Sequence, residues 1–324
     1  MSIVQPLGYE VEPFSIVQMR DNSRFYISTF LLFIMLISPA TIAEGESEEW
    51  YVEGGNSVLM EQFTATWCDV CAKIDPWISD FVDDRGSRLI RVALHDPIND
   101  PLGNSITSER LSNFPDGQNL APSFWFDSSG EIKGIVAPVD LDRALLNSEG
   151  NRDSDTTISI SVSKTDNNSL ELTINFYLTE NISNTQASIF LLADKNIDKS
   201  LATNGITTHE DVTRGYVNLE ILENHTINQE LLESNFNSGF SNVSLIRTSS
   251  GYTVNLNFDL VNEETEEISI VAVHESLIDG ERTTLGAVSL PLGQASNDDR
   301  VSILTPLLCI MILSTVILFK DRFL

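Results

Sequence analysis

Between residues 58 and 150, stretches with the period of a β-strand alternate with stretches with the period of an α-helix. Ile74, Trp77, Ile78 and Phe81 recur at i, i+3, i+4 and i+7, which is one apolar face of a helix. The same reasoning predicts strands at 58–63 and 89–94, helices at 105–111 and 140–146, and a hairpin joining 124–126 to 132–136. This order is typical of an α/β domain, which we expect over residues 44–150.

Beyond residue 150 the period changes to two. Apolar and polar residues alternate over 158–162, 170–176, 252–258 and 268–272, and no long helical pattern interrupts them. Such strands at intervals predict an all-β, immunoglobulin-like sandwich of antiparallel strands over residues 153–293.

Two apolar segments flank these domains. The apolar run at 30–37 follows Arg20 and Arg24 and ends in small residues, so residues 1–43 are expected to hold a secretory signal peptide or an uncleaved anchor. After a polar tether at 294–300, residues 301–319 carry no charge and are followed by Lys320 and Arg322. We expect a transmembrane helix at 301–319 and a cytoplasmic tail at 320–324. The chain would then be a single-pass protein of the cell membrane with both domains on the extracytoplasmic side.

The charge balance excludes one class of partner. The 324 residues carry a formal net charge of −28, whereas nucleic-acid binding needs a basic surface that displaces counterions from phosphates. We therefore expect no nucleic-acid partner.

The chemistry of the chain is expected at Cys68 and Cys71. The sequence Trp67-Cys68-Asp69-Val70-Cys71 follows a predicted strand and opens a predicted helix. There the first cysteine meets unpaired N–H groups and the positive end of the helix dipole, which stabilise a thiolate, and the second can resolve a mixed disulfide. Two cysteines with this spacing can also form half of a zinc site, for which His95 is the one nearby candidate for a further ligand. The other alternative is an inert structural disulfide. With three cysteines in all, we expect no metal and no cofactor beyond the pair.

The residues around the pair resemble thioredoxins. Phe63–Cys71 is similar to the active-site segment of that family, Pro76 to the proline of its active-site helix, and 120–124 to its cis-proline loop. The resemblance covers roughly residues 50–148. It implies a redox-active disulfide between Cys68 and Cys71, with Trp67 and Pro122 contacting the substrate.

Two departures from the thioredoxin pattern bear on the chemistry. Gln62 stands where the family holds a buried aspartate that serves the second cysteine, and strand alternation should point the adjacent Glu61 to the other face. The carboxylate of Asp69, next to Cys68, disfavours a thiolate there, which favours a reducing or modest role. His95 ends a predicted parallel strand and should emerge on the same edge as Cys68, either in proton transfer or as an ordinary loop histidine.

Together these patterns predict a membrane-anchored thiol–disulfide oxidoreductase. Cys68 would be the nucleophile and Cys71 the resolving residue, acting on thiols or disulfides of proteins with an unidentified electron donor or acceptor. The alternative is a surface binding module, in which the β-sandwich recognises a partner and the thioredoxin-like domain is a weakly active or inactive scaffold.

Overall fold

The structure, a computed structural model, describes residues 48–114, 120–152, 156–165, 168–177, 184–221, 239–260, 267–278 and 281–293. The signal or anchor segment expected in 1–43, the tether 294–300, the transmembrane helix 301–319 and the tail 320–324 lie outside these residues. Among the described residues, no helix is both long and apolar enough to cross a lipid bilayer.

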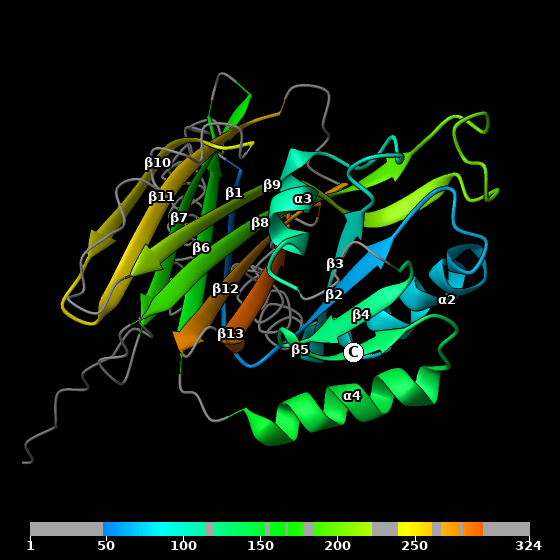
Figure 1. Cartoon of the computed structure of the whole chain (residues 1–324). Helices are drawn as coiled ribbons and strands as arrows, with labels where there is room; N and C mark the ends of the chain where they lie inside the picture. The colour runs from blue at the N-terminus through cyan, green and yellow to red at the C-terminus, as the bar shows by residue number, and fades with distance from the viewer. Residues whose placement is uncertain are drawn as a thin grey trace, which may run out of the picture. The chain divides into compact units, whose positions relative to one another are not determined.

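The described chain has a mixed α/β architecture with two sheets (Figure 1). Its first part contains β1 (Glu49–Gly54), β2 (Val58–Thr64), α2 (Cys71–Asp83), β3 (Leu89–His95), α3 (Ser105–Leu111), β4 (Ser123–Phe126), β5 (Ser129–Lys133) and α4 (Pro138–Asn151). Its second part contains β6 (Thr157–Lys164), β7 (Ser169–Tyr177), β8 (Thr185–Asn196), β9 (Thr208–Ile221), β10 (Ser241–Arg247), β11 (Gly251–Asp259), β12 (Ile268–Ile278) and β13 (Glu281–Pro291).

The predicted elements of both parts are present where periodicity placed them. The period-3.6 face of α2 is buried against the sheet, and its interior Pro76 is exposed. In the predicted hairpin, the second strand begins earlier than expected, at Ser129. Residues Asp127, Ser128 and Gly130 adopt positive φ, so the chain reverses within the turn itself and β5 ends at Lys133.

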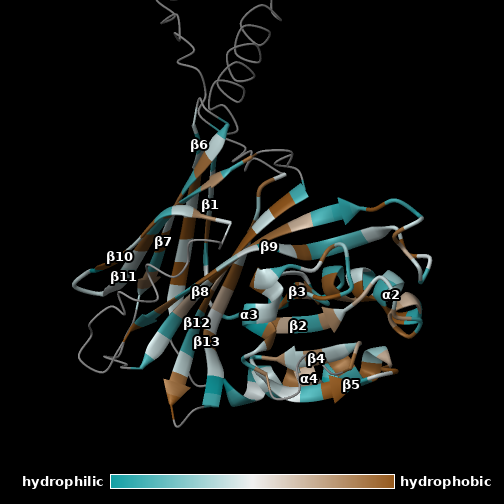
Figure 2. Cartoon of the chain, turned by 45° about the horizontal axis from the view of Figure 1, so that its top comes forward, coloured by the Kyte–Doolittle hydropathy of each residue, from teal (hydrophilic) through white to brown (hydrophobic). Residues whose placement is uncertain are grey.

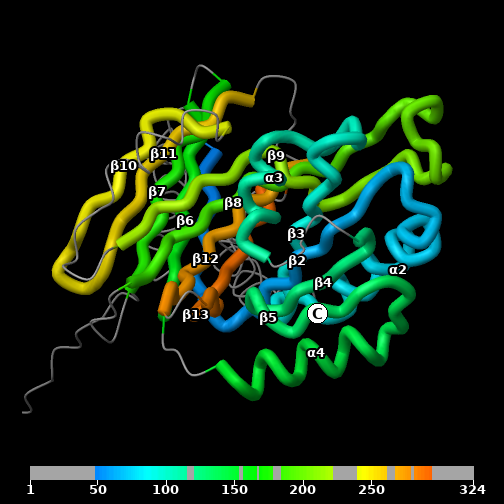
Figure 3. Tube along the Cα trace, in the orientation of Figure 1, coloured from blue at the N-terminus to red at the C-terminus, as the bar shows by residue number. Residues whose placement is uncertain are grey.

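One mixed sheet of eight strands runs through both parts of the chain, in the order β13-β12-β8-β9-β3-β2-β4-β5 (Figure 3). β2 and β3 are parallel, β4 is antiparallel to β2, and β9 joins the edge of β3 through the pairing of Ala93 with Val212. The remaining sheet is antiparallel, with the order β1-β6-β7-β11-β10. The expected division at residues 150–153 therefore does not separate two sheets.

Strand β1 belongs to a different sheet from the one expected, so the α/β region begins later than residue 44. Residues 49–54 were assigned to it, but β1 pairs with β6 in the five-stranded sheet. The reason is its alternating pattern, which buries Trp50 in the core between the two sheets and leaves Glu49 and Tyr51 at the surface. Apolar burial thus draws this strand to the second part of the chain.

Strand β8 is buried on both faces and connects two cores. Ile189 and Leu191 face the five-stranded sheet, whereas Phe190 and Leu192 pack in a second core with Trp125 and the side chains of α3. In Figure 2 the strands of the five-stranded sheet carry alternating hydrophobic and hydrophilic bands, as expected for strands with one solvent face.

A buried ion-pair network crosses between the two parts of the chain. Arg110 on α3 is fully buried and donates to both carboxylate oxygens of Glu61 on β2, at 2.5 and 2.8 Å, and of Glu275 on β12, at 3.1 and 2.8 Å. Arg282 on β13 donates to Glu275 at 3.0 Å. Because each buried carboxylate meets a guanidinium, the desolvation of these charges is offset only when both parts are packed together.

Candidate functional site

The cysteine pair lies at the carboxyl end of β2, where the chain turns into α2. A disulfide joins Cys68 to Cys71, whose Cα atoms are 5.2 Å apart. Cys71 is completely buried, and Cys68 is 5% exposed, so Cys68 is the sulfur nearer to solvent. The backbone N–H of Cys71 donates to Sγ of Cys68 at 3.0 Å. A thiolate on Cys68 would accept this same hydrogen bond at the start of the helix, where the backbone dipoles favour negative charge.

The loop before β4 lies against Cys68. The Ala121–Pro122 peptide bond is cis, as the resemblance to thioredoxins implied. It brings the carbonyl oxygen of Ala121 to 3.5 Å from Sγ of Cys68, and Pro122 itself is buried. The structure therefore places this loop next to the pair, while the expected substrate role of Pro122 remains a prediction.

Trp67 forms part of the rim around the pair. Trp67 is 45% exposed, and its indole N–H donates to Oδ2 of Asp96 at 2.9 Å, while the expected contact of Trp67 with substrate remains a prediction. Asp96 in turn accepts the backbone N–H of Ile98, so the indole is held by a loop that follows β3. Asp96 was not identified from the sequence, although its place at the end of a parallel strand is a usable signal.

The loop between β8 and β9, residues 197–207, lies against residues 65–68, which we call the redox loop. The side-chain amide of Asn204 donates to the carbonyl oxygens of Ala65 and Cys68 at 3.2 and 3.3 Å, and its backbone N–H donates to Thr66 at 2.9 Å. These bonds pair backbone groups that a buried loop would otherwise leave unsatisfied. No local pattern identifies Asn204, because its partners precede it by more than 130 residues.

A buried carboxylate on α2 lies against the end of β2. Asp75 lies one turn after Cys71 and is buried, and its carboxylate accepts from Nε2 of Gln62 and from Oγ1 of Thr64, both at 2.7 Å. Gln62 thus faces α2, whereas Glu61 faces α3 through Arg110, which confirms the expected alternation along β2. Sequence reasoning missed Asp75 because it searched for the acid on the strand.

His95 is neither exposed nor isolated. It is buried at the end of β3, and its Nδ1 lies 3.0 Å from Oδ2 of Asp100. Burial alone would raise the pKa of Asp100, but the hydrogen bond and charge of His95 lower it, together with the backbone N–H groups of Leu102 and Thr66. The ring of His209 on β9 packs edge-on against His95, with ring centroids 5.1 Å apart. Burial first, and then the neighbouring His95, lower the pKa of His209.

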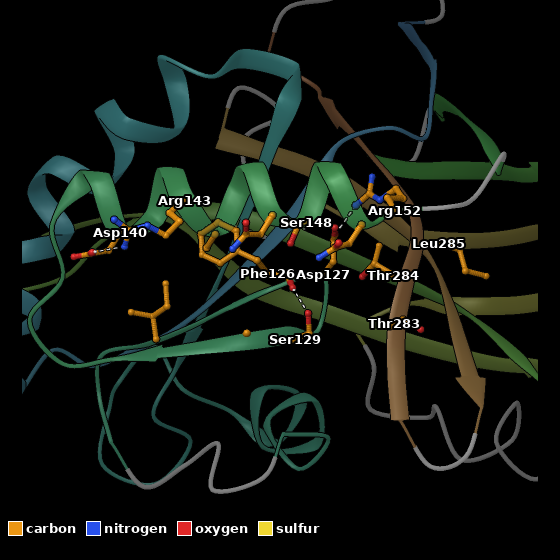
Figure 4. A pocket seen from close by; sticks show the side chains of 15 residues that line it. Phe126, Asp127, Ser129, Asp140, Arg143, Ser148, Arg152, Thr283, Thr284 and Leu285 are labelled. Atoms are coloured by element: carbon orange, nitrogen blue, oxygen red, sulfur yellow. Dashed lines mark hydrogen bonds and ion pairs between the residues drawn. The ribbon is translucent and has the colours of Figure 1, made fainter.

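A separate groove of about 690 Å³ lies between α4, the β4–β5 turn and β13 (Figure 4). It is at the other end of the sheet from the disulfide, because Asp127 follows β4 beside Leu59 at the start of β2. Arg152 bonds to Asp127 at 2.5 Å, and Arg143 pairs with Asp140 at 3.4 Å. The groove is thus lined by paired charges and does not share a wall with the cysteines.

The described residues contain no group of three or more histidine, cysteine, aspartate or glutamate side chains placed to hold a metal ion.

The comparisons with known proteins support the fold. No protein-family model matches the chain, and no curated protein matches its sequence. The structure is similar to that of HBP35 of Porphyromonas gingivalis, with a TM-score of 0.52 and 14% identity over 74% of this chain and 76% of that one. The protein AGR_C_4864 from Agrobacterium tumefaciens aligns at a TM-score of 0.49 and 13% identity, over 74% of this chain and 96% of that one. At these identities the likeness to HBP35 concerns the fold alone.

Proposed function

We propose that this chain is a thioredoxin-like thiol–disulfide oxidoreductase that acts on protein thiols or disulfides at the extracytoplasmic face of a membrane. The observation that carries the proposal is the Cys68–Cys71 disulfide at the start of α2, with its outer sulfur beside the cis-proline loop. A pair of this kind is suited to accept and return two electrons.

When the Cys68–Cys71 disulfide is reduced, a thiolate of a substrate or donor attacks Sγ of Cys68, the more exposed sulfur. The Cys68–Cys71 bond breaks, a mixed disulfide forms at Cys68, and Cys71 leaves as a thiolate that takes up a proton. A second thiol of the donor then displaces Cys68, so that the donor is oxidised to a disulfide and the pair is reduced to two thiols. With a protein disulfide as substrate the same steps run in reverse.

The hydrogen bond at the N-terminus of α2 and the burial of Cys71 support Cys68 as the nucleophile and Cys71 as the resolving residue. The N–H of Cys71 stabilises a thiolate on Cys68, while the complete burial of Cys71 keeps intermolecular attack away from it. Trp67 and the Ala121–Pro122 loop supply the walls beside Cys68 that an extended substrate segment would contact. The membrane location is proposed from the apolar segments of the sequence alone.

The test is the reduction potential of the full chain carrying Cys309→Ser, so that only two thiols are counted. The protein is equilibrated against glutathione, and alkylated thiols are counted by mass spectrometry. A reversible two-thiol couple, which Cys68→Ser abolishes, supports the proposal; a value near roughly −270 mV would indicate a reductant and one near roughly −120 mV an oxidant. A disulfide that exchanges with no thiol would refute it and leave the binding module.

A further inference from the structure

Four exposed apolar side chains come from four separate segments around Cys68. They are Trp67 in the redox loop, Ile98 in the loop after β3, Leu120 in the loop before β4 and Leu201 in the β8–β9 loop. Single exposed apolar residues are ordinary on a protein surface, whereas a group of them at one place indicates a surface that binds an apolar partner. The fourth member belongs to the second part of the chain.

Hydrogen bonds hold the three segments of the first part beside the disulfide. The carboxylate of Asp96 accepts from the indole N–H of Trp67 and from the backbone N–H of Ile98, at 2.9 and 3.0 Å, so these two side chains rise from one short loop pair. The carbonyl oxygen of Ala121, the residue after Leu120, lies 3.5 Å from the outer sulfur. These segments therefore form a rim around the sulfur that meets the substrate.

The β8–β9 loop brings Leu201 to the same rim. Besides the bonds of Asn204 to the redox loop, Oγ1 of Thr203 donates to the carbonyl oxygen of Thr66 at 3.3 Å. The N–H of Leu201 donates to the carbonyl oxygen of Asp198 at 2.8 Å, which closes a turn and fixes its backbone. Leu201 stands three positions before Asn204, so their Cα atoms are at most about 11 Å apart. An extended substrate segment covers that distance in about three residues.

The exposed charges next to this rim have both signs. Asp69 and Lys73 follow the redox loop, and Asp198 and Lys199 precede Leu201, all four at the surface. A charged side chain of a substrate therefore meets an attractive and a repulsive group on each side. Burial of an apolar side chain against Leu201 has no such opposing term, so apolar contact is the better basis for discrimination between substrates.

We infer that Leu201 is a specificity-determining residue, which selects substrate segments with bulky apolar side chains about two to four residues from the reacting cysteine. The inference rests on the proposed function and extends the substrate-binding surface onto the second part of the chain. The occupant is an extended, cysteine-containing segment of another protein, since the reactive disulfide lies within the rim. Apolar residues next to a cysteine are exposed mainly in chains that are not fully folded, which makes incompletely folded proteins the substrate class.

The test measures how fast Cys68 forms a mixed disulfide with defined peptides. The full chain carrying Cys71→Ser and Cys309→Ser keeps Cys68 as its one thiol. Each peptide has a single cysteine bonded to thionitrobenzoate. The Cys68 thiolate attacks the peptide sulfur, a disulfide joins Cys68 to the peptide, and coloured thionitrobenzoate leaves with the electron pair of the broken bond. Two peptides of equal length and charge carry either leucine or serine at the second and third positions on each side of the cysteine.

The measured quantity is the second-order rate constant for the leucine peptide divided by that for the serine peptide. Any change in the reactivity of the Cys68 thiolate cancels in this ratio. We expect Leu201→Ser to lower the ratio about 3- to 10-fold, because the leucine side chains of the peptide lose an apolar contact. Leu201→Met keeps that contact and should retain the ratio. Leu146→Ser is the matched control, at a leucine of α4 that is 60% exposed against 51% for Leu201, and should also retain it.

The outcomes separate the inference from the proposed function. An unchanged ratio in Leu201→Ser, or an equal fall in Leu146→Ser, would overturn the inference. If Leu201 instead packs against a second copy of the chain, Leu201→Ser lowers the mass found by sedimentation and leaves the ratio unchanged, which also overturns it. If neither peptide reacts with Cys68 in the folded chain, the proposed function fails. If both react but the ratio is independent of Leu201, only the inference fails.

Discussion

Replacing Arg110 by methionine should destabilise the whole described fold. The side chain is fully buried, and its removal deletes two hydrogen bonds to Glu61 and two to Glu275 while leaving both carboxylates inside the protein. Methionine keeps much of the apolar volume, so the loss measures charge rather than a cavity.

The magnitude follows from the burial of the network. Removing one partner of a buried ion pair costs about 3–5 kcal/mol, because an uncompensated charge remains in a medium of low dielectric constant. For a folded unit of this size, that corresponds to a fall in Tm of roughly 6–20 °C. Arg143→Met, at an arginine that is 68% exposed and pairs with Asp140, is the matched control and should change stability by less than about 1 kcal/mol.

The dependence on pH tests the physical cause. Burial alone would raise the pKa of Glu275, but the charges of Arg110 and Arg282 lower it to about 2. Its contribution to wild-type stability is therefore present above its unfolded pKa, about 4.5, and is lost as the pH falls toward 2. In Arg110→Met, Glu275 loses the larger of the two charges that lower its pKa, so ionised Glu275 is less stable inside the protein. The difference in unfolding free energy between the wild type and the variant should therefore be largest near pH 7 and shrink below about pH 4.5, where a protonated carboxyl needs no cation.

Chemical denaturation followed by tryptophan fluorescence and circular dichroism measures the loss of unfolding free energy and its dependence on pH. The two signals should change together, because Glu61 and Glu275 lie in the two parts of the chain that Arg110 connects. A loss below about 1 kcal/mol at pH 7, or a deficit that is the same at pH 4 and pH 7, would refute the reasoning.

Three further predictions concern the site and the core. Asn204→Ala should remove two hydrogen bonds to the redox loop, at roughly 1 kcal/mol each, and speed amide hydrogen exchange around Cys68; unchanged exchange would mean that the β8–β9 loop does not hold it. Burial lowers the pKa of His274 to about 4, so wild-type stability should fall as the pH drops from about 6.5 to about 4, and His274→Gln should remove that slope in a urea-unfolding series. Asp69→Asn removes an exposed carboxylate beside Cys68 and should speed alkylation of the reduced chain at pH 7 by roughly 2- to 5-fold, with an unchanged rate counting against any electrostatic role.

Features that depend on neighbours in the sequence were predictable. The period of the apolar residues placed α2, β3, β6, β7, β11 and β12, because each element buries at least one stripe or one face. The position of the cysteine pair at a strand end, the exposure of Trp67 and the opposite directions of Glu61 and Gln62 follow from the same local geometry.

The remainder was decided by packing between segments far apart in the chain. Nothing local indicates that β1 leaves the α/β region to cover the core at Trp50, since an alternating pattern shows which face is apolar but not which sheet the strand joins. Likewise, His95 and His209 are separated by 114 positions in the sequence, and their ring centroids lie 5.1 Å apart because β9 adds to the edge of β3. Local periodicity thus set which face of each element is apolar, whereas the association of the sheets, driven by burial of those faces, decided which residues surround the disulfide.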